Sequence, residues 1–288
     1  MVTVRGGLSK VKQTSPLTAR MVPWYVAPSY GGKPAANSFL CRVSLLVSGS
    51  PQFETQDDSG RGDGICAVSQ WQSPFSVKDT GSHLLDFDKL DLDPALRNIA
   101  NRLRSILHSP AILSATDLHD LTCFTLHRLL SLPPLPSVGF PEFNTSECMR
   151  YAISAYMFII HGPTYYSHVH LLNTLIIQLK SHINSMLSWR ECQDSMLLWL
   201  LSVGAVASIG TNENDWFCNE AGTIAGTLGA RGWDDIEMHL SKVLWLGTRS
   251  SVLFQQTWED ILASASALGS LVLSDDHEYR PNFPTRVA

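Results

Sequence analysis

The sequence of 288 residues has few charged side chains, and this scarcity excludes several kinds of protein surface. Charged residues make up 16% of the chain, whereas about a quarter is usual in soluble domains. The 21 basic residues are outnumbered by 26 acidic ones, which gives a formal net charge of −5, and they form no basic stripe. This balance argues against a nucleic-acid-binding surface, and the low charge leaves surface for a partner to cover.

Long apolar runs and closely spaced cysteines are also missing. The longest apolar run, from Met196 to Ile209, is shorter than the roughly 20 residues that a membrane-spanning helix needs. Residues 1–7 lack the apolar core of a signal peptide, so we expect a soluble intracellular protein with reduced thiols and no disulfides. No short-spaced zinc site can form from its six cysteines, which are Cys41, Cys66, Cys123, Cys148, Cys192 and Cys218.

What the chain does contain is apolar residues, 44% of the total, arranged at helical spacing from residue 93 onward. Asp93 and Pro94 are typical of a helix start, and we predict further starts at Thr116 and Thr145. Little of the sequence resembles a strand, and the linkers are short, so the pattern predicts an all-α bundle of antiparallel helices. The clearest apolar stripes run from Val169 to Met186, from Phe217 to Leu228, and from Phe254 through Trp258, Ile261 and Ala265 to Leu268.

One predicted helix has no polar face. Met196 to Ala207 is apolar all round, which is typical of a helix at the centre of a bundle. Tryptophans follow in the segments that we expect to surround it, with indole N–H groups bonded to internal acceptors. The predicted structural core includes Leu197, Trp199, Leu200, Trp216, Trp233, Trp245 and Trp258.

The N-terminal third has a different character, and it divides the chain into three parts. Residues 1–92 are predicted to be a poorly structured, irregular segment, with a mobile polar loop at about 48–64. Residues 93–274 are the predicted helical domain. Residues 275–288 are polar, contain two prolines and are predicted to be a tail.

Candidate metal ligands are few. His168 and His170 stand two residues apart, and such residues face different directions on a helix. Asp234 and Asp235 sit where acids stabilise a helix start. The acidic group Asp275, Asp276, His277 and Glu278 lies in the predicted tail and has no matching second set of ligands. We therefore expect no metal, no cofactor and no catalytic residue, and hence no enzyme.

Three further motifs have ordinary explanations. Gly222, Gly226 and Gly229 are spaced like a phosphate loop but lack its Gly-Lys-Ser/Thr ending and a preceding strand, so helix packing is the better interpretation. Residues 61–63 match an adhesion tripeptide, and residues 144–146 match a glycosylation site. Both are expected to be accidental in a protein that is not secreted.

Several segments together resemble the regulatory domain of fungus-specific transcription factors. This helical domain usually lies downstream of a binuclear zinc-cluster DNA-binding domain. The resembling segments cover most of the chain and are 1–8, 17–24, 118–133, 148–152 and 197–207, followed by Asp215-Trp216-Phe217, Leu228-Gly229, Trp233-Asp234-Asp235, Leu244-Trp245-Leu246 and Trp258-Glu259-Asp260.

The resemblance implies a nuclear, non-catalytic regulator that acts through protein contacts or a small effector. It implies no catalytic residue, because the shared motifs serve packing. The closely spaced zinc-cluster cysteines have no counterpart here, and the N-terminal segment corresponds to one inside the family's domain. The chain is therefore similar to the C-terminal portion of such a regulator, with a protein partner or a second copy bound through helix faces and no specific DNA binding.

A different class of function fits the same composition. A small all-α enzyme or ligand carrier of secondary metabolism would have a tryptophan-lined cavity between the central helix and its neighbours. An enzyme would also place several acids, histidines or a metal around one cavity. The sequence shows no such cluster.

Overall fold

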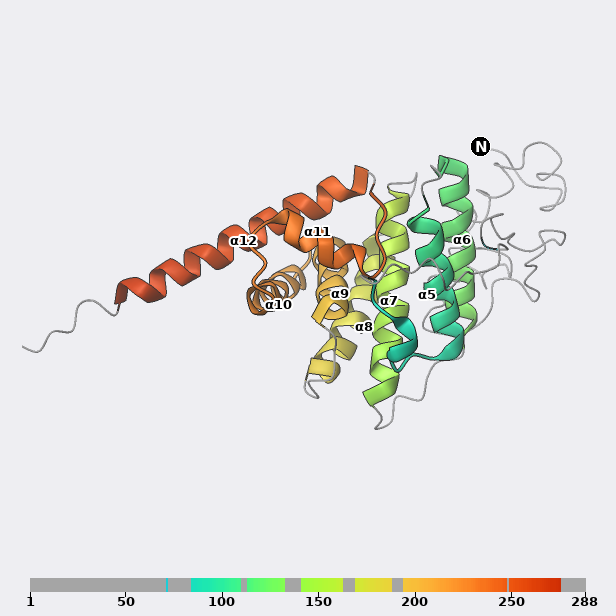
Figure 1. Ribbon diagram of the computed structural model, residues 1–288, viewed down its shortest axis with the longest axis horizontal. Helices are drawn as coiled ribbons and strands as arrows, with labels where there is room; N and C mark the ends of the chain where they lie inside the picture. Colours follow the sequence, from blue (N-terminus) through green and yellow to red (C-terminus); the bar gives the residue numbers. More distant parts are fainter. Residues whose placement is uncertain are drawn as a thin grey trace, which may run out of the picture.

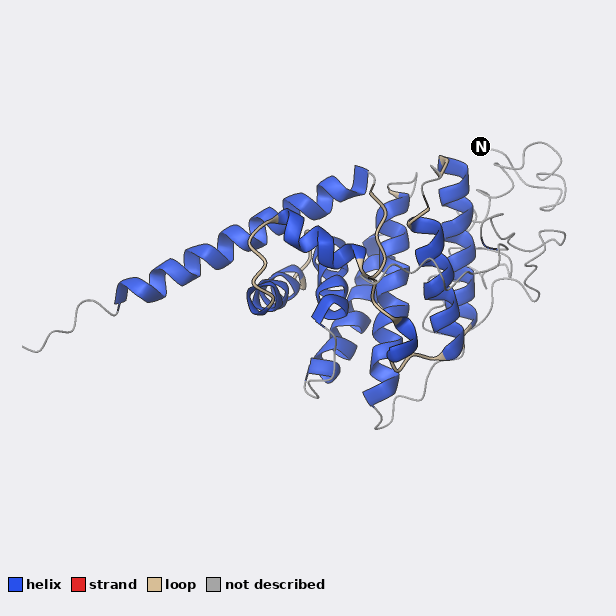
Figure 2. Ribbon diagram, viewed as in Figure 1, coloured by secondary structure: helices blue, strands red, loops and turns tan. Residues whose placement is uncertain are grey.

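The computed structural model describes residue 71 and residues 84–109, 113–132, 141–162, 169–187, 194–247 and 249–275. These residues form helices joined by turns, without a strand among them (Figures 1 and 2), which confirms the predicted all-α class. The predicted loop at 48–64 and residues 276–288 lie outside the described residues. The helices are η4 (Phe87–Lys89), α5 (Pro94–Leu107), α6 (Ala115–Ser131), α7 (Pro141–His161), α8 (Val169–Leu187), α9 (Asp194–Ala207), α10 (Asn214–Thr227), α11 (Trp233–Ser241) and α12 (Arg249–Asp275).

Helix α9 lies at the centre of the bundle, as its all-round apolar sequence predicts. Every residue from Met196 to Ala207 is buried. The helix packs against α7, α8, α10, α11 and α12 (Figure 1). Its one buried hydroxyl within this run, on Ser202, donates to the carbonyl of Leu198 at 2.6 Å, so the polar group has a partner without leaving the core. Among the described helices, none combines the length and the hydropathy needed to cross a membrane.

Helices α7 and α8 form the closest-packed pair. Four residues of the predicted stripe on α8 are buried in the bundle: Ile176, Leu179, Ile183 and Met186. Helix α7 begins at Pro141 and not at the predicted Thr145. Proline is well suited to the first turn of a helix, where its missing N–H would have no partner in any case.

Two helix starts show how local sequence sets the boundaries. At α5 the Asp93 carboxylate accepts hydrogen bonds from the N–H groups of Ala95 at 2.9 Å and Leu96 at 3.1 Å, as predicted. At α6 the cap is Ser114 rather than the predicted Thr116. Ser114 and Asp117 form a reciprocal capping box, which satisfies two N–H groups that a cap at Thr116 would leave without partners.

Residues 84–92 belong to the helical domain, so the predicted boundary at residue 93 is wrong. The side chains of Leu85, Phe87, Leu90 and Leu92 are buried in the same core as the helices. The N–H of Leu85 also donates to the carbonyl of Lys242 at 2.9 Å, which joins this segment to the turn after α11.

Arginines on α5 hold this segment in place. Arg104 is buried, donates to the carbonyl of Leu85, and places its guanidinium 4.1 Å from the centroid of the Phe87 ring. Arg97 donates to the carbonyls of Leu90 and Leu92 at 3.2 and 3.0 Å. These charge-assisted bonds satisfy carbonyls that no helix pairs, which is why an irregular segment can be buried.

Helix α12 packs on the bundle at its beginning and then extends away from it (Figure 1). Phe254, Trp258 and Ile261 are buried, as predicted. Ala265, which was predicted to continue this stripe, is exposed, because the helix has left the bundle by that point. A helix of 27 residues is about 40 Å long at 1.5 Å per residue, longer than the core that its first turns cover.

Candidate functional site

Trp199 of α9 and two of the later tryptophans, Trp233 and Trp245, belong to an aromatic cluster with Tyr156 and Phe254. Ring centroids are 5.6 Å apart for Tyr156 and Trp199, 5.2 Å for Trp245 and Phe254, and 5.9 Å for Trp233 and Trp245. Edge-to-face and tilted contacts at these distances are typical of packed cores. The cluster joins α7, α9, α11 and α12 at the centre of the molecule.

The Tyr156 hydroxyl and the indole groups of Trp199, Trp245 and Trp258 have partners inside the protein. The hydroxyl of Tyr156 accepts from the N–H of Leu246 at 2.9 Å, and complete burial raises the pKa of Tyr156, so the phenol stays protonated. Three indole N–H groups also have acceptors. Trp199 donates to the carbonyl of Leu244 at 2.7 Å, and Trp245 donates to the carboxylate of Glu237 at 3.0 Å. Trp258 donates to the hydroxyl of Ser202 at 3.1 Å.

Of the predicted core residues, Leu197, Trp199, Leu200, Trp245 and Trp258 are buried. Trp216 and Trp233 are not: they are partly buried and pack against the edge of the core. Both lie in the first turns of their helices, α10 and α11, and the tryptophan ring is so large that complete burial is uncommon.

Trp216 has a charged neighbour on its outer face. The Lys180 amine lies 5.2 Å from the centroid of the Trp216 ring and pairs with the carboxylate of Glu213. The contact between a cation and an aromatic face stabilises the edge of the bundle between α8 and α10.

The predicted candidates for phosphate binding and acid chemistry occupy structural positions. Asp234 and Asp235 lie in the first turn of α11, and Asp235 accepts from the N–H of Arg231 at 2.8 Å. Gly222 and Gly226 lie inside α10, while Gly229 follows it with φ of +69° and ends the helix. These positions agree with helix capping and packing.

The histidine and acidic motifs are placed only in part. His170 and Asp275 belong to α8 and α12, whereas His168, Asp276, His277, Glu278 and residues 61–63 lie outside the described residues. Within the described residues, no group of three or more histidine, cysteine, aspartate or glutamate side chains is arranged to hold a metal ion.

The structure brings together a cysteine and two histidines that the sequence analysis did not single out. Cys123 and His119 lie one turn apart on α6, with the sulfur 3.6 Å from the His119 Nε2 atom. The Nδ1 atom of His119 lies 2.9 Å from the Nε2 atom of His161, the last residue of α7. The spacing of four residues places His119 and Cys123 on the same face of a helix, so their contact could have been predicted from the sequence. The contact with His161 could not, because His161 comes from another helix.

A second polar group joins α7 to its neighbours. Glu147 and Arg150 are buried and paired at 3.3 Å, and Arg150 also donates to the carbonyl of Leu132 at 3.1 Å. The Tyr151 ring stacks on His182 of α8 with centroids 5.6 Å apart. Burial raises the pKa of Tyr151 and lowers the pKa of His182, so both side chains are neutral near pH 7.

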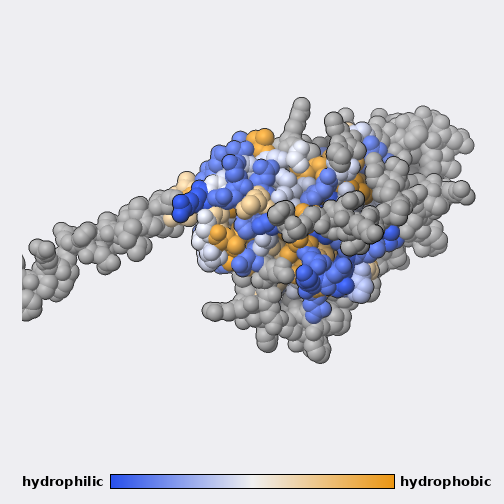
Figure 3. Space-filling view, in the orientation of Figure 1, coloured by the Kyte–Doolittle hydropathy of each residue, from blue (hydrophilic) through white to orange (hydrophobic). Residues whose placement is uncertain are grey.

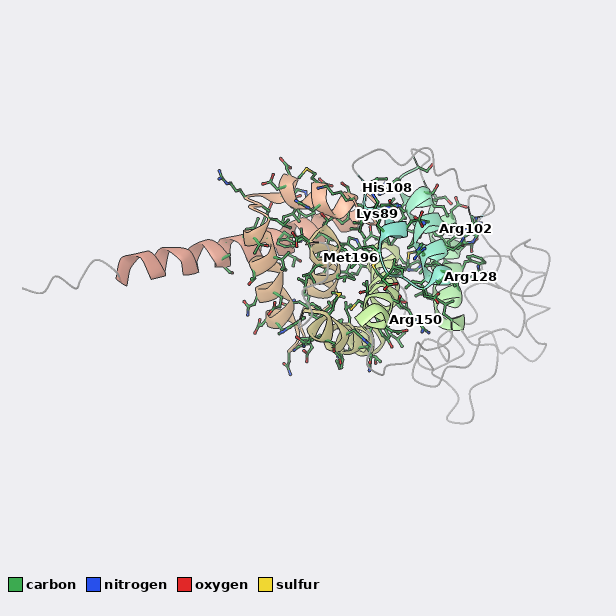
Figure 4. The ribbon with its side chains drawn as sticks, turned by 60° about the horizontal axis from the view of Figure 1, so that its bottom comes forward. Lys89, Arg102, His108, Arg128, Arg150 and Met196 are labelled. Atoms are coloured by element: carbon green, nitrogen blue, oxygen red, sulfur yellow. The ribbon has the colours of Figure 1, made fainter. Side chains whose placement is uncertain are left out.

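Basic side chains on α5, α6 and α7 lie on the side of the molecule away from α12. Figure 4 shows Arg102, Arg128 and Arg150 on this side. Arg102 donates to the carbonyl of Trp71, as Arg97, Arg104 and Arg150 donate to other main-chain carbonyls. These hydrogen bonds to main-chain carbonyls give Arg97, Arg102, Arg104 and Arg150 a role in stabilising the fold.

Several large apolar side chains are exposed on the described helices and the turn after α9. Val252 and Leu253, in the first turns of α12, are 54% and 40% exposed. Met238 on α11 is also exposed, as are Ile177 on α8 and Ile209 after α9. Figure 3 shows separate hydrophobic areas among hydrophilic ones on the face that it presents.

Comparisons of the chain with protein-family models, with curated proteins and with solved structures found no match.

Proposed function

We propose that this protein is a helical regulatory domain of the fungal transcription-factor type, which acts in the nucleus by binding another protein. The proposal is supported by one observation above all. Helix α12 exposes Val252 and Leu253 where it meets the bundle and then continues as a helix beyond it (Figure 1). Helices bury apolar faces against other helices, so the partner surface is a helix that packs along α12.

The aromatic cluster supports a role without catalysis. Its rings contact one another, and the Tyr156 hydroxyl and the indole groups of Trp199 and Trp258 bond to internal partners. The tryptophans are therefore explained by packing, without a ligand between them. The nuclear location and the regulatory role themselves follow from the sequence resemblance.

The proposal predicts that aspartates at Val252 and Leu253 will abolish regulation. The full chain is joined to an unrelated DNA-binding domain in fungal cells that carry a reporter gene, and the reporter output is measured. We expect the wild-type chain to change the output and the double variant to lose this effect. Two charges in an apolar contact should weaken association by about 2 kcal/mol or more, roughly 30-fold.

A matched control separates the partner surface from general surface effects. Ile177→Asp places one such charge on an apolar side chain of α8 that is 53% exposed, and it should leave the reporter output unchanged, whereas either single aspartate at Val252 or Leu253 should reduce it. If the wild-type fusion has no effect on the reporter, the protein is not a regulator of this kind.

The protein alone should bind duplex DNA weakly and without sequence preference. DNA affinity requires clustered basic groups that neutralise phosphates, and here Arg97, Arg102, Arg104 and Arg150 donate to main-chain carbonyls. A mobility-shift measurement at physiological salt should show binding only in the non-specific range of about 1 to 100 μM. A shift by submicromolar protein that depends on the DNA sequence would contradict this prediction.

A further inference from the structure

The geometry points to Cys123 as a nucleophilic thiol, activated by His119 and positioned by His161, which adds to soft carbon electrophiles such as α,β-unsaturated carbonyl compounds. This inference goes beyond the proposed function, because it concerns a covalent modification site and not a partner surface. It rests on three side chains from two helices: Cys123 and His119 from α6 and His161 from α7.

The hydrogen bonds make a connected path from sulfur to the second histidine. The Cys123 sulfur faces the Nε2 atom of His119 at 3.6 Å, and the Nδ1 atom of His119 faces the Nε2 atom of His161 at 2.9 Å. His119 therefore uses both ring nitrogens. Such an arrangement, in which a nucleophile bonds to a base and the base is oriented by a third group, is the geometry of an activated nucleophile.

The activation requires one particular tautomer of the two histidines. Burial lowers the pKa of His161, so its ring is neutral at pH 7. In the tautomer that activates the thiol, the Nε2 atom of His161 accepts a hydrogen bond from the Nδ1–H group of His119. With Nδ1 protonated, the Nε2 atom of His119 can take the thiol proton. The product is an imidazolium beside a thiolate, and the pairing lowers the pKa of a cysteine thiol.

The position on the helices favours the same charges. His161 is the last residue of α7, and the carbonyl end of a helix stabilises a nearby cation. The ionisable side chains on the path from the Cys123 sulfur are His119 on the same helix and His161 on α7. Cys123 is buried, with 8% of its surface exposed, so the labelling reagent must be small.

The reaction is balanced without any further reagent. The thiolate of Cys123 attacks the β carbon of the electrophile and forms an S–C bond, while the electron pair of the C=C bond moves to the α carbon. That carbon then takes the proton from the Nε2–H group of His119. The imidazole returns to its neutral form, and the adduct is a thioether.

Two other cysteines in the described residues provide internal references. Cys148 is completely buried. Cys218 is partly exposed, but burial and the nearby carboxylates of Asp215 and Asp260 raise the pKa of its thiol. A histidine-activated Cys123 should therefore differ from both in the pH dependence of its reaction and not only in its accessibility.

The experiment is labelling of the native full chain with N-ethylmaleimide, followed by mass spectrometry of peptides to give a rate for each cysteine. Proton transfer to His119 gives more thiolate at pH 6, and the lower intrinsic nucleophilicity of such a thiolate offsets only part of this gain. We expect Cys123 to react about tenfold faster than Cys218 at pH 6. We expect His119→Gln to slow Cys123 about tenfold at pH 6 and to have little effect at pH 9.

His161→Gln, which keeps His119, provides a second variant in case the first fails to fold. It should slow Cys123 at pH 6 by a smaller factor, and thermal melts establish that each variant is folded. The inference is overturned if Cys123 labels no faster than Cys218 at pH 6, if its rate rises tenfold per pH unit like an ordinary thiol, or if it reacts only after denaturation.

Discussion

Replacement of Leu200 by aspartate should abolish the cooperative unfolding transition of this protein. Leu200 is completely buried on α9, which contacts five other helices. Loss of the leucine side chain costs about 2–5 kcal/mol, and a buried carboxylate without a partner adds several kcal/mol. Because a folded domain is stable by only about 5–15 kcal/mol, this one change is comparable to the whole free energy of unfolding.

The measurement is a thermal or urea melt followed by circular dichroism, with Leu253→Asp as the matched control. Leu253 is exposed on the first turns of α12, where an acidic side chain is compatible with the helix dipole. The control should change the free energy of unfolding by less than about 1 kcal/mol. A cooperative melt of Leu200→Asp near the wild-type midpoint would mean that α9 is not the centre of the core.

Alanine at Gly204 should destabilise the protein, although alanine is the better helix former. A Cβ atom at Gly204 of α9 would lie 2.1 Å from the ring of Phe217 on α10. That ring is completely buried and packs edge-on against Trp216 at 4.8 Å, so it has no free space to enter. Overpacking costs about 1–3 kcal/mol or more, which exceeds the gain in helix propensity of about 1 kcal/mol.

Gly226 offers the matched control, because it also lies inside a helix. A Cβ atom there would meet no atom within 4 Å, so Gly226→Ala should stabilise the protein by about 0.4–1 kcal/mol. Urea melts of the two variants should therefore shift in opposite directions. In a Phe217→Ala background, Gly204→Ala should lose its penalty, since the clash is removed. Equal shifts for both glycines would contradict the close approach of α9 and α10.

The sequence alone was sufficient to predict the helices and the identity of the central one. Helix starts depend on local chemistry, as at Asp93, and a segment without polar residues has no surface to expose. The same reasoning placed Asp234 and Asp235 at a helix start, which the structure confirms. These features could be predicted because each is decided by residues within a few positions of one another.

The predicted helix starts and domain boundary were wrong where the local sequence was compatible with more than one structure. Thr116 and Ser114 are both suitable caps, and the reciprocal bond with Asp117 decides for Ser114. Residues 84–92 have no helical period, so they were predicted to be irregular and outside the domain. Their burial depends on Arg97 and Arg104, which bind their carbonyls from the following helix.

The remaining features were decided by tertiary structure, because they depend on residues far apart in the chain. From the sequence, Gly204 and Gly226 are equivalent glycines inside helices, and only the position of Phe217 gives their replacement opposite effects. The spacing of His119 and Cys123 is visible in the sequence, whereas the contact with His161 exists only because α7 ends beside α6. Helical period and composition therefore determined which segments are helices and which helix is central. The packing of those helices decided which side chains meet, because contact between side chains depends on distance in space and not on separation along the chain.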